Sequence, residues 1–230
     1  MKKQICKGQL CAEFLGSMFL VMASISSMIL FIEVLDIPKG VAVFGNSIAV
    51  TFVLCALIEM FSPISGAHFN PVVTMVMAFE KKIGILKASL FMLFQFAGGI
   101  AGVALSHLMF LNEVGALLAV SDNTRNEYIF FGEIFGTFIL VLAILLLIKA
   151  GSNKISIIVG LLVGGQLLST SSTMFANPQV TVARMLTDTA SGIRPIDGLI
   201  FIAMQIIGAL LAYMVYKFIF AKKKYETEEK

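Results

Sequence analysis

A five-residue motif that begins with Asn-Pro occurs twice in this chain, each time between long apolar runs. The copies start at Asn70 and Asn177, and each has threonine at its fifth position. An asparagine amide offers two N–H donors and a carbonyl acceptor, so it can hydrogen-bond an uncharged polar solute. The segment before Asn70, with Gly66, Ala67 and His68, is predicted to be extended, with carbonyls free to accept hydrogen bonds from the same solute. These residue types indicate a path for a neutral molecule.

Both asparagines also have a purely structural explanation. Asn immediately before Pro is a favourable helix N-cap, and Pro71 and Pro178 fall where a helix tolerates proline best. Recurrence of the motif at related positions in two halves favours pore lining over capping alone.

The composition indicates that most of the protein surface contacts lipid. Of the 230 residues, 58% are apolar and only 13% are charged, which leaves a soluble domain too little polar surface. The first apolar run, 10–32, is longer than a secretory h-region and lacks a cleavage pattern, so we expect a retained span. The three cysteines have no metal-ligand spacing and are expected to be structural thiols, with no metal site and no cofactor.

The segment lengths predict an all-α integral membrane fold of six transmembrane helices plus two re-entrant half-helices. The full spans are expected at 10–32, 42–61, 88–110, 129–149, 155–173 and 197–220. The shorter pieces, 70–79 and 177–186, can cross only half of the hydrocarbon, because ten helical residues extend about 15 Å. A single channel domain is expected, with repeat one at 10–110, a linker at 111–128, repeat two at 129–220 and a charged tail at 221–230.

The basic residues predict the orientation of these spans. Most fall on one side of the threaded chain: Lys2, Lys3, Lys7, Lys81, Lys82, Lys87, Lys149, Lys154, Lys217, Lys222, Lys223, Lys224 and Lys230. The opposite side carries Lys39, Arg125, Arg184 and Arg194. Both termini are then cytoplasmic, in a multi-pass protein of the cell membrane. A unit of three spans begins on one side of the membrane and ends on the other, so the second copy is inserted in the inverted orientation. The two half-helices then meet near the midplane, where irregular backbone implies a pore.

The motifs resemble a known family. The segment Ser-Gly-Ala-His-Phe-Asn-Pro-Val-Val-Thr at 65–74 is similar to the first signature of the major intrinsic proteins, the aquaporins and aquaglyceroporins. The resemblance covers nearly the whole chain and implies an inverted-repeat, aquaporin-like bundle with a pore in each subunit of a homotetramer. It also implies passive conduction of water or small neutral solutes across the lipid bilayer. Val72 and Gln179 replace the usual Ala of the two signatures.

A second departure concerns the filter that selects the solute. Val180 stands where the family usually has an arginine, and the other filter positions, counted without gaps from the asparagines, map to Val50, Gly165 and Met174. Such a filter is predicted to be wide and apolar, which penalises water and favours larger, less hydrated neutral molecules. The resemblance therefore favours an aquaglyceroporin-like channel for polyols, urea or undissociated metalloid acids such as arsenous acid, since a family branch lacking this arginine is associated with metalloids.

Arg184 lies two helical turns after Asn177 and has two explanations. It could stand at the outer mouth and replace part of the missing charge. The favoured alternative is an ion pair with Asp188 at i+4, or an anchor at the level of the lipid phosphates.

Glu13 and Glu133 are single carboxylates within the first span of each half, where they are costly without partners. One explanation is a proton relay, which would make the protein a secondary transporter. The other, supported by the resemblance, is a brace that accepts hydrogen bonds from the amides of a re-entrant loop. The brace is favoured, because no His or Asp accompanies the carboxylates along either span.

Other functions stay open as alternatives. A water-selective aquaporin or, with less support, a proton-coupled secondary transporter shares these features, and a closed junction or adhesion protein could use the same fold. An enzyme would need a nucleophile with a base, paired carboxylates or metal ligands at matched depth, and the two histidines in unrelated segments do not provide them. Nothing in the sequence indicates a nucleic-acid partner.

Overall fold

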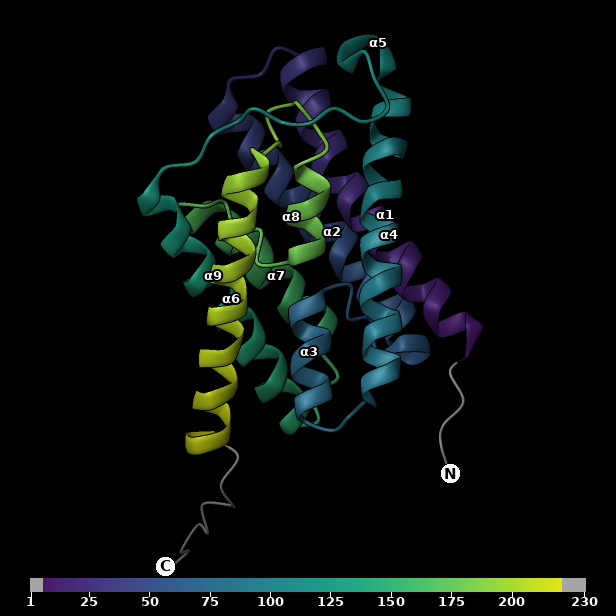
Figure 1. Ribbon diagram of the computed structural model, residues 1–230, viewed down its shortest axis with the longest axis vertical. Helices are drawn as coiled ribbons and strands as arrows, with labels where there is room; N and C mark the ends of the chain where they lie inside the picture. The colour runs from purple at the N-terminus through teal and green to yellow at the C-terminus, as the bar shows by residue number, and fades with distance from the viewer. Residues whose placement is uncertain (1–5, 221–230) are drawn as a thin grey trace, which may run out of the picture.

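The computed structural model describes residues 6–220, which are helical and contain no strand (Figure 1). The predicted tail 221–230 lies outside these residues. The helices are α1 (Lys7–Ile29), α2 (Lys39–Ser65), α3 (Pro71–Phe79), α4 (Ile85–Met109), α5 (Leu111–Val114), α6 (Glu127–Lys149), α7 (Ile155–Ser169), α8 (Pro178–Arg184) and α9 (Pro195–Val215). Turns of π-helix extend α1 to Val34 and α9 to Phe220.

Within residues 6–220, five helices are long and apolar enough to cross a membrane: α1, α2, α4, α6 and α9. The fifth expected span, 155–173, is shorter than predicted, because α7 has 15 residues and extends only about 22 Å. The chain leaves the helix at Thr170, whose backbone is extended. Its hydroxyl accepts a hydrogen bond from the Met174 N–H at 2.9 Å, so the end of the predicted span belongs to a re-entrant loop.

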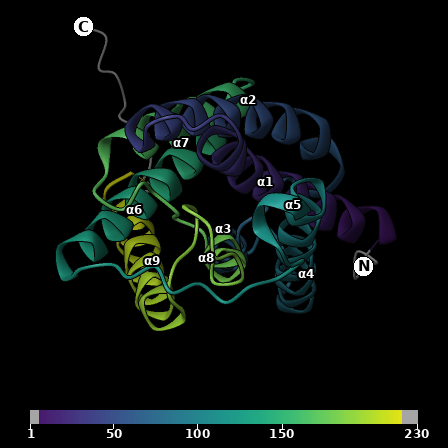
Figure 2. The same ribbon diagram turned by 90° about the horizontal axis from the view of Figure 1, so that it is seen from above.

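The two short helices α3 and α8 lie in the middle of the bundle and run toward opposite ends (Figure 1). Seen from above, they overlap at the centre, with α4 on one side and α9 on the other (Figure 2). Each of them packs against both α4 and α9, so each half of the chain holds the short helix of the other. Contacts of α1 with α2 and α4 have counterparts in those of α6 with α7 and α9, which is the pattern of a structural repeat.

Glycines at equivalent positions allow the closest helix contacts. A Cβ on Gly98 would lie 2.3 Å from the Phe14 carbonyl oxygen, and a Cβ on Gly208 would lie 2.4 Å from that of Ile134. Small residues at such crossings let backbones approach, which supplies van der Waals packing where lipid removes the hydrophobic driving force. The same device therefore joins α1 to α4 and α6 to α9.

The linker 111–128 crosses one end of the bundle, which we call the linker end; the opposite end carries the start of α1 and the end of α9 (Figure 1). The linker is hydrogen-bonded to the segment after α8, through the N–H groups of Ala119 and Ser121 to the carbonyls of Leu186 and Met185, both at 3.0 Å. This strap fixes the chain that follows α8.

Candidate pore and its lining

Asn70 and Asn177 are the N-caps of α3 and α8. The Oδ1 of Asn70 accepts a hydrogen bond from the Val72 N–H at 3.0 Å, and that of Asn177 accepts one from the Gln179 N–H at 3.2 Å. Proline follows directly at the first helical position of both, where its missing N–H costs nothing. The short helices thus begin where the sequence places them.

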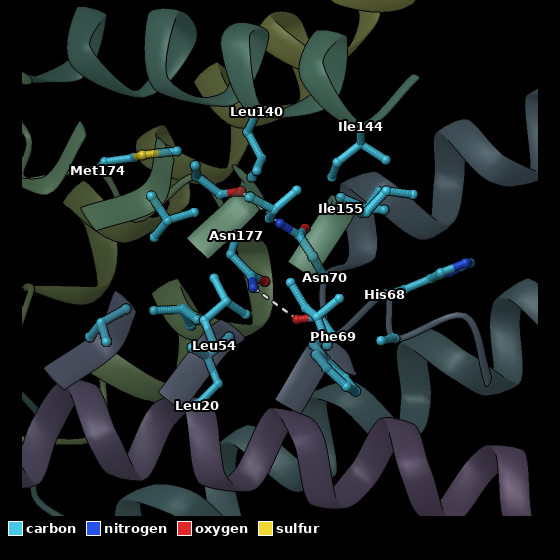
Figure 3. Close-up of a pocket in the computed structure, with 18 of the residues that line it drawn as sticks. Leu20, Leu54, His68, Phe69, Asn70, Leu140, Ile144, Ile155, Met174 and Asn177 are labelled. Atoms are coloured by element: carbon cyan, nitrogen blue, oxygen red, sulfur yellow. Dashed lines mark hydrogen bonds between the residues drawn. The ribbon is translucent and has the colours of Figure 1, made fainter. Parts of the chain in front are cut away.

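The two asparagines also join the loops to each other. The Nδ2 of Asn70 donates to the Ala176 carbonyl at 2.9 Å. The Nδ2 of Asn177 donates to the Phe69 carbonyl, also at 2.9 Å, which Figure 3 shows as a dashed line. An amide has two N–H donors, so each asparagine keeps one N–H beyond this crossed pair. Both side chains line a cavity of about 310 Å³.

The loops before the asparagines are strained in matching ways. Ala67 and Phe69 have φ values of 50° and 47°, and Met174 and Ala176 have values of 36° and 46°. Residues with side chains rarely adopt this left-handed region, and they keep it only where surrounding contacts enforce it, as happens at functional sites.

The Glu13 carboxylate supplies such contacts to the first loop. Its Oε1 accepts hydrogen bonds from the Ser65 hydroxyl at 2.6 Å and the His68 N–H at 3.0 Å. Its Oε2 accepts from the Phe69 N–H at 2.8 Å and from the Gln95 amide at 2.7 Å. The carboxylate is fully buried, and both oxygens are occupied by donors of the loop and of α4.

Glu133 has the equivalent contacts in the second loop. It accepts hydrogen bonds from the N–H groups of Phe175 at 2.9 Å and Ala176 at 2.8 Å, and from the Gln205 amide at 2.6 Å. The same Gln205 amide donates to the Thr181 hydroxyl on α8 at 2.8 Å. Glu133 and Gln205 together therefore connect α6 and α9 with the loop and the short helix.

The cavity presents a polar strip and an aliphatic wall. Gly66, Ala67 and His68 line it, and their carbonyls accept no hydrogen bond from residues 6–220. The opposing wall includes Leu140, Ile144 and Ile155 (Figure 3). Of the site residues proposed from the sequence, those that line the cavity are Val50, Gly66, Ala67, His68, Asn70, Met174, Asn177, Val180 and Arg184.

The placement of Gly165 in the filter is wrong. Gly165 is exposed on the outer face of α7, where an added Cβ would meet no atom within 4 Å. Val163 and Leu167, one helical turn apart, line the cavity instead. Gly165 lies midway between them in sequence and so points to the opposite face of α7, because each residue turns the helix by about 100°.

His68 is fixed by contacts behind the loop. Its Nδ1 lies 3.0 Å from the Thr74 hydroxyl, and its ring meets the ring of Phe91 edge-on at 5.5 Å between centroids. In the close-up the imidazole points away from Asn177 (Figure 3). The side chain therefore holds the loop to α3 and α4.

Arg184 does not form the expected ion pair with Asp188. The helix α8 ends at Arg184, so i+4 geometry does not extend to Asp188, whose carboxylate instead accepts a hydrogen bond from the Asp122 N–H at 3.3 Å. The guanidinium lies over the Phe175 ring, 4.2 Å from its centroid. Among the described residues, Arg184 is the one that lines both the large cavity and a second cavity of about 180 Å³ at the linker end.

This second cavity, the linker-end cavity, is lined by Met28, Lys39, Val43, Asn46, Arg125, Ile129, Ser171, Ser172, Thr173, Arg184, Ala190 and Ser191. Arg125 in the linker is held by donating to the Gly192 carbonyl at 3.0 Å. Burial lowers the pKa of Arg125, and the neighbouring Asp197 carboxylate opposes that shift. The guanidinium still carries its charge at neutral pH, because its ordinary pKa is so high.

Sequence reasoning missed two elements of the site. Leu167 could have been found from the repeat of Val159, Val163 and Leu167 at four-residue intervals, which marks one face of a helix. The role of Gln179 had no such signal. Its Nε2 donates to the Phe69 carbonyl at 3.3 Å, a group far away in sequence.

Apolar helices around two re-entrant loops and a cavity define an integral membrane pore protein. The sequence model of the family described as Major intrinsic protein matches residues 1–176, and the chain belongs to this family. It is 35% identical over 209 residues to the aquaglyceroporin AqpS of Rhizobium meliloti (strain 1021), covering 90% of this chain and 88% of that protein. It is 29% identical over 151 residues to aquaporin-5 of Rattus norvegicus, covering 63% of this chain and 55% of that protein.

The fold is similar to that of a solved aquaglyceroporin. The crystal structure of the aquaglyceroporin from Plasmodium falciparum superimposes with a TM-score of 0.68 at 18% identity, covering 93% of this chain and 96% of that one. The aquaporin fold predicted from the sequence is therefore confirmed. The protein is a membrane channel through which small uncharged solutes pass passively.

Proposed function

We propose that this channel favours uncharged solutes that are larger and less hydrated than water, namely polyols, urea or undissociated metalloid acids such as arsenous acid. The observation that carries the proposal is the cavity lining beside Asn177. Val50, Leu167, Met174 and Val180 line it there and offer aliphatic or thioether surface, without a strong hydrogen-bonding group. A water molecule loses hydrogen bonds in such surroundings, whereas a solute with carbon or metalloid surface loses fewer.

The polar strip supports the same assignment. The spare amide N–H groups of Asn70 and Asn177 can donate to a solute hydroxyl, and the carbonyls of Gly66, Ala67 and His68 can accept from one. A polyol can direct its hydroxyls to this strip and its CH groups to the aliphatic wall. Few convergent polar groups on an otherwise apolar lining are typical of sites that orient small molecules.

The proposal is tested with purified protein in liposomes. Stopped-flow rates for water, glycerol, urea and arsenous acid should rank the larger solutes above water, each relative to protein-free liposomes. Val180→Arg should reduce glycerol and arsenous acid flux much more than water flux, because a guanidinium adds bulk and donors to the lining. Val120→Arg is the matched control, because Val120 is exposed in the linker and does not line the cavity. A wild type that conducts water and excludes glycerol would instead support the water-selective alternative.

We also infer the orientation and the assembly. Lys39, Arg125 and Arg194 lie toward the linker end, while Lys7 and Lys149 lie toward the other, which supports an extracellular linker end and cytoplasmic termini in the cell membrane. The family resemblance supports a homotetramer with one pore in each subunit. Reporter fusions at the C-terminus test the orientation, and native mass spectrometry of the purified protein tests the tetramer.

A further inference from the structure

The linker-end cavity has an unbalanced set of charges. Its described lining includes the three cations Lys39, Arg125 and Arg184 and no acidic side chain. Ser171 adds a hydroxyl that makes no hydrogen bond within residues 6–220. The cavity of about 180 Å³ is therefore a small, positively charged chamber whose walls also carry apolar side chains, including Met28, Val43 and Ile129.

Arg184 is the least satisfied of these cations. Its side chain belongs to a residue only 6% exposed, and its Nε has no hydrogen-bond partner among the described residues. The Glu133 carboxylate attracts it, but both of those oxygens are occupied by loop amides. The face of the Phe175 ring is its close contact. Burying a guanidinium without hydrogen-bond partners is costly, so the arrangement is suited to an oxygen ligand that supplies them.

We infer that the linker-end cavity binds a small oxyanion of the phosphate type. The guanidinium of Arg184 would donate to the oxyanion as a fork, while Lys39 and Arg125 supply further charge and Ser171 a hydroxyl donor. Because Arg184 lines both cavities, the proposal places the anion at the boundary between them, where it would obstruct a solute moving from the linker end into the larger cavity. The apolar lining around Val180 opposes its onward passage, so the bound anion blocks flux without being conducted.

Binding is tested without any flux measurement. Purified wild-type protein in detergent should broaden the ³¹P resonance of inorganic phosphate in a saturable way. Arg184→Gln should weaken this binding by about tenfold or more, since it removes a charge-assisted contact. Arg194→Gln is the matched control, because Arg194 lies at the same end but pairs with Asp197 at 3.0 Å and does not line the cavity. Should Arg184→Gln fail to fold, Lys39→Gln on an exposed side chain should still weaken binding severalfold. If folded Arg184→Gln or Lys39→Gln broadens the phosphate resonance as much as the wild type does, the inference is overturned.

The blocking effect rests on the proposed channel function and is measured separately. Glycerol flux into liposomes should fall severalfold when phosphate replaces chloride at matched osmolality and ionic strength on both sides. Arg184→Gln should conduct glycerol equally in both salts, and Arg194→Gln should respond like the wild type. If the wild type conducts no glycerol even in chloride, the proposed solute class is wrong, whereas the phosphate-binding measurement is unaffected. Phosphate binding together with unchanged glycerol flux would refute the block.

Discussion

The hydrogen bonds of Glu133 predict that Glu133→Gln, although nearly isosteric, lowers the free energy of unfolding substantially. The glutamine carbonyl can keep the hydrogen bonds of Oε2, from Ala176 and Gln205, but its NH₂ group then faces the Phe175 N–H, which loses its acceptor. An unsatisfied buried N–H costs about 1–3 kcal/mol, and exchanging a charged acceptor for a neutral one weakens each remaining bond. We therefore expect the free energy of unfolding to fall by about 3–5 kcal/mol, on the basis of these typical hydrogen-bond energies.

The effect is measured by unfolding the purified protein in mixed micelles and by stopped-flow glycerol flux. Glu127→Gln is the control, because Glu127 is exposed in the first turn of the same helix. Its loss should change the unfolding free energy by no more than about 1 kcal/mol. Flux through folded Glu133→Gln should fall only partly, since the glutamine keeps the hydrogen bonds from Ala176 in the loop and from Gln205 in α9. Equal stability losses in both variants would refute the brace. Proton-gradient-dependent flux in the wild type that becomes independent of the gradient in Glu133→Gln would establish a relay instead.

Three further predictions concern the packing of the site. Gly99→Ala should lower the free energy of unfolding by about 1–2 kcal/mol, because the new Cβ would lie 2.3 Å from Gln179 Oε1. In the Gln179→Ala background the same change should cost much less, which a double-mutant cycle of unfolding free energies measures. Leu167→Phe should reduce glycerol flux severalfold, whereas Gly165→Phe, on the outer face of the same helix, should leave flux unchanged in the same stopped-flow assay. Asn177→Leu should abolish glycerol flux while the protein still inserts in the membrane, and wild-type flux in that variant would remove the residue from the pore.

Much of the framework follows from local sequence. Asn and Pro in succession set a cap and a first turn, so the starts of α3 and α8 were predictable at Asn70 and Asn177. Apolar segment lengths predicted the long helices, because a bilayer sets the number of residues needed to cross it. The relation of Glu13 to Glu133 was visible from the repeat. These features depend on neighbours within a few residues or on lipid as a common solvent.

The rotation of each helix about its axis was decided only by tertiary packing. Gly160 and Gly164 on α7 receive Cys55 and Thr51 of α2 in close contact. This fixes the phase of α7 and directs Leu167, not Gly165, toward the cavity. Counting residues from an asparagine on another helix cannot supply that angle, since a shift of two residues reverses the face.

The position of the Arg184 side chain likewise could not be predicted from the sequence. Seven helical residues place it near the face of Asn177, and both an ion pair with Asp188 and an outer-mouth position were compatible with that spacing. The end of α8 at Arg184 removes the i+4 relation, and stacking on Phe175 from the neighbouring loop holds the guanidinium between the two cavities. Sequence thus determined the helices, the caps and the paired loops, because these are local or set by lipid. The tertiary structure alone decided which side chains face the path, because that depends on contacts between segments far apart in the chain.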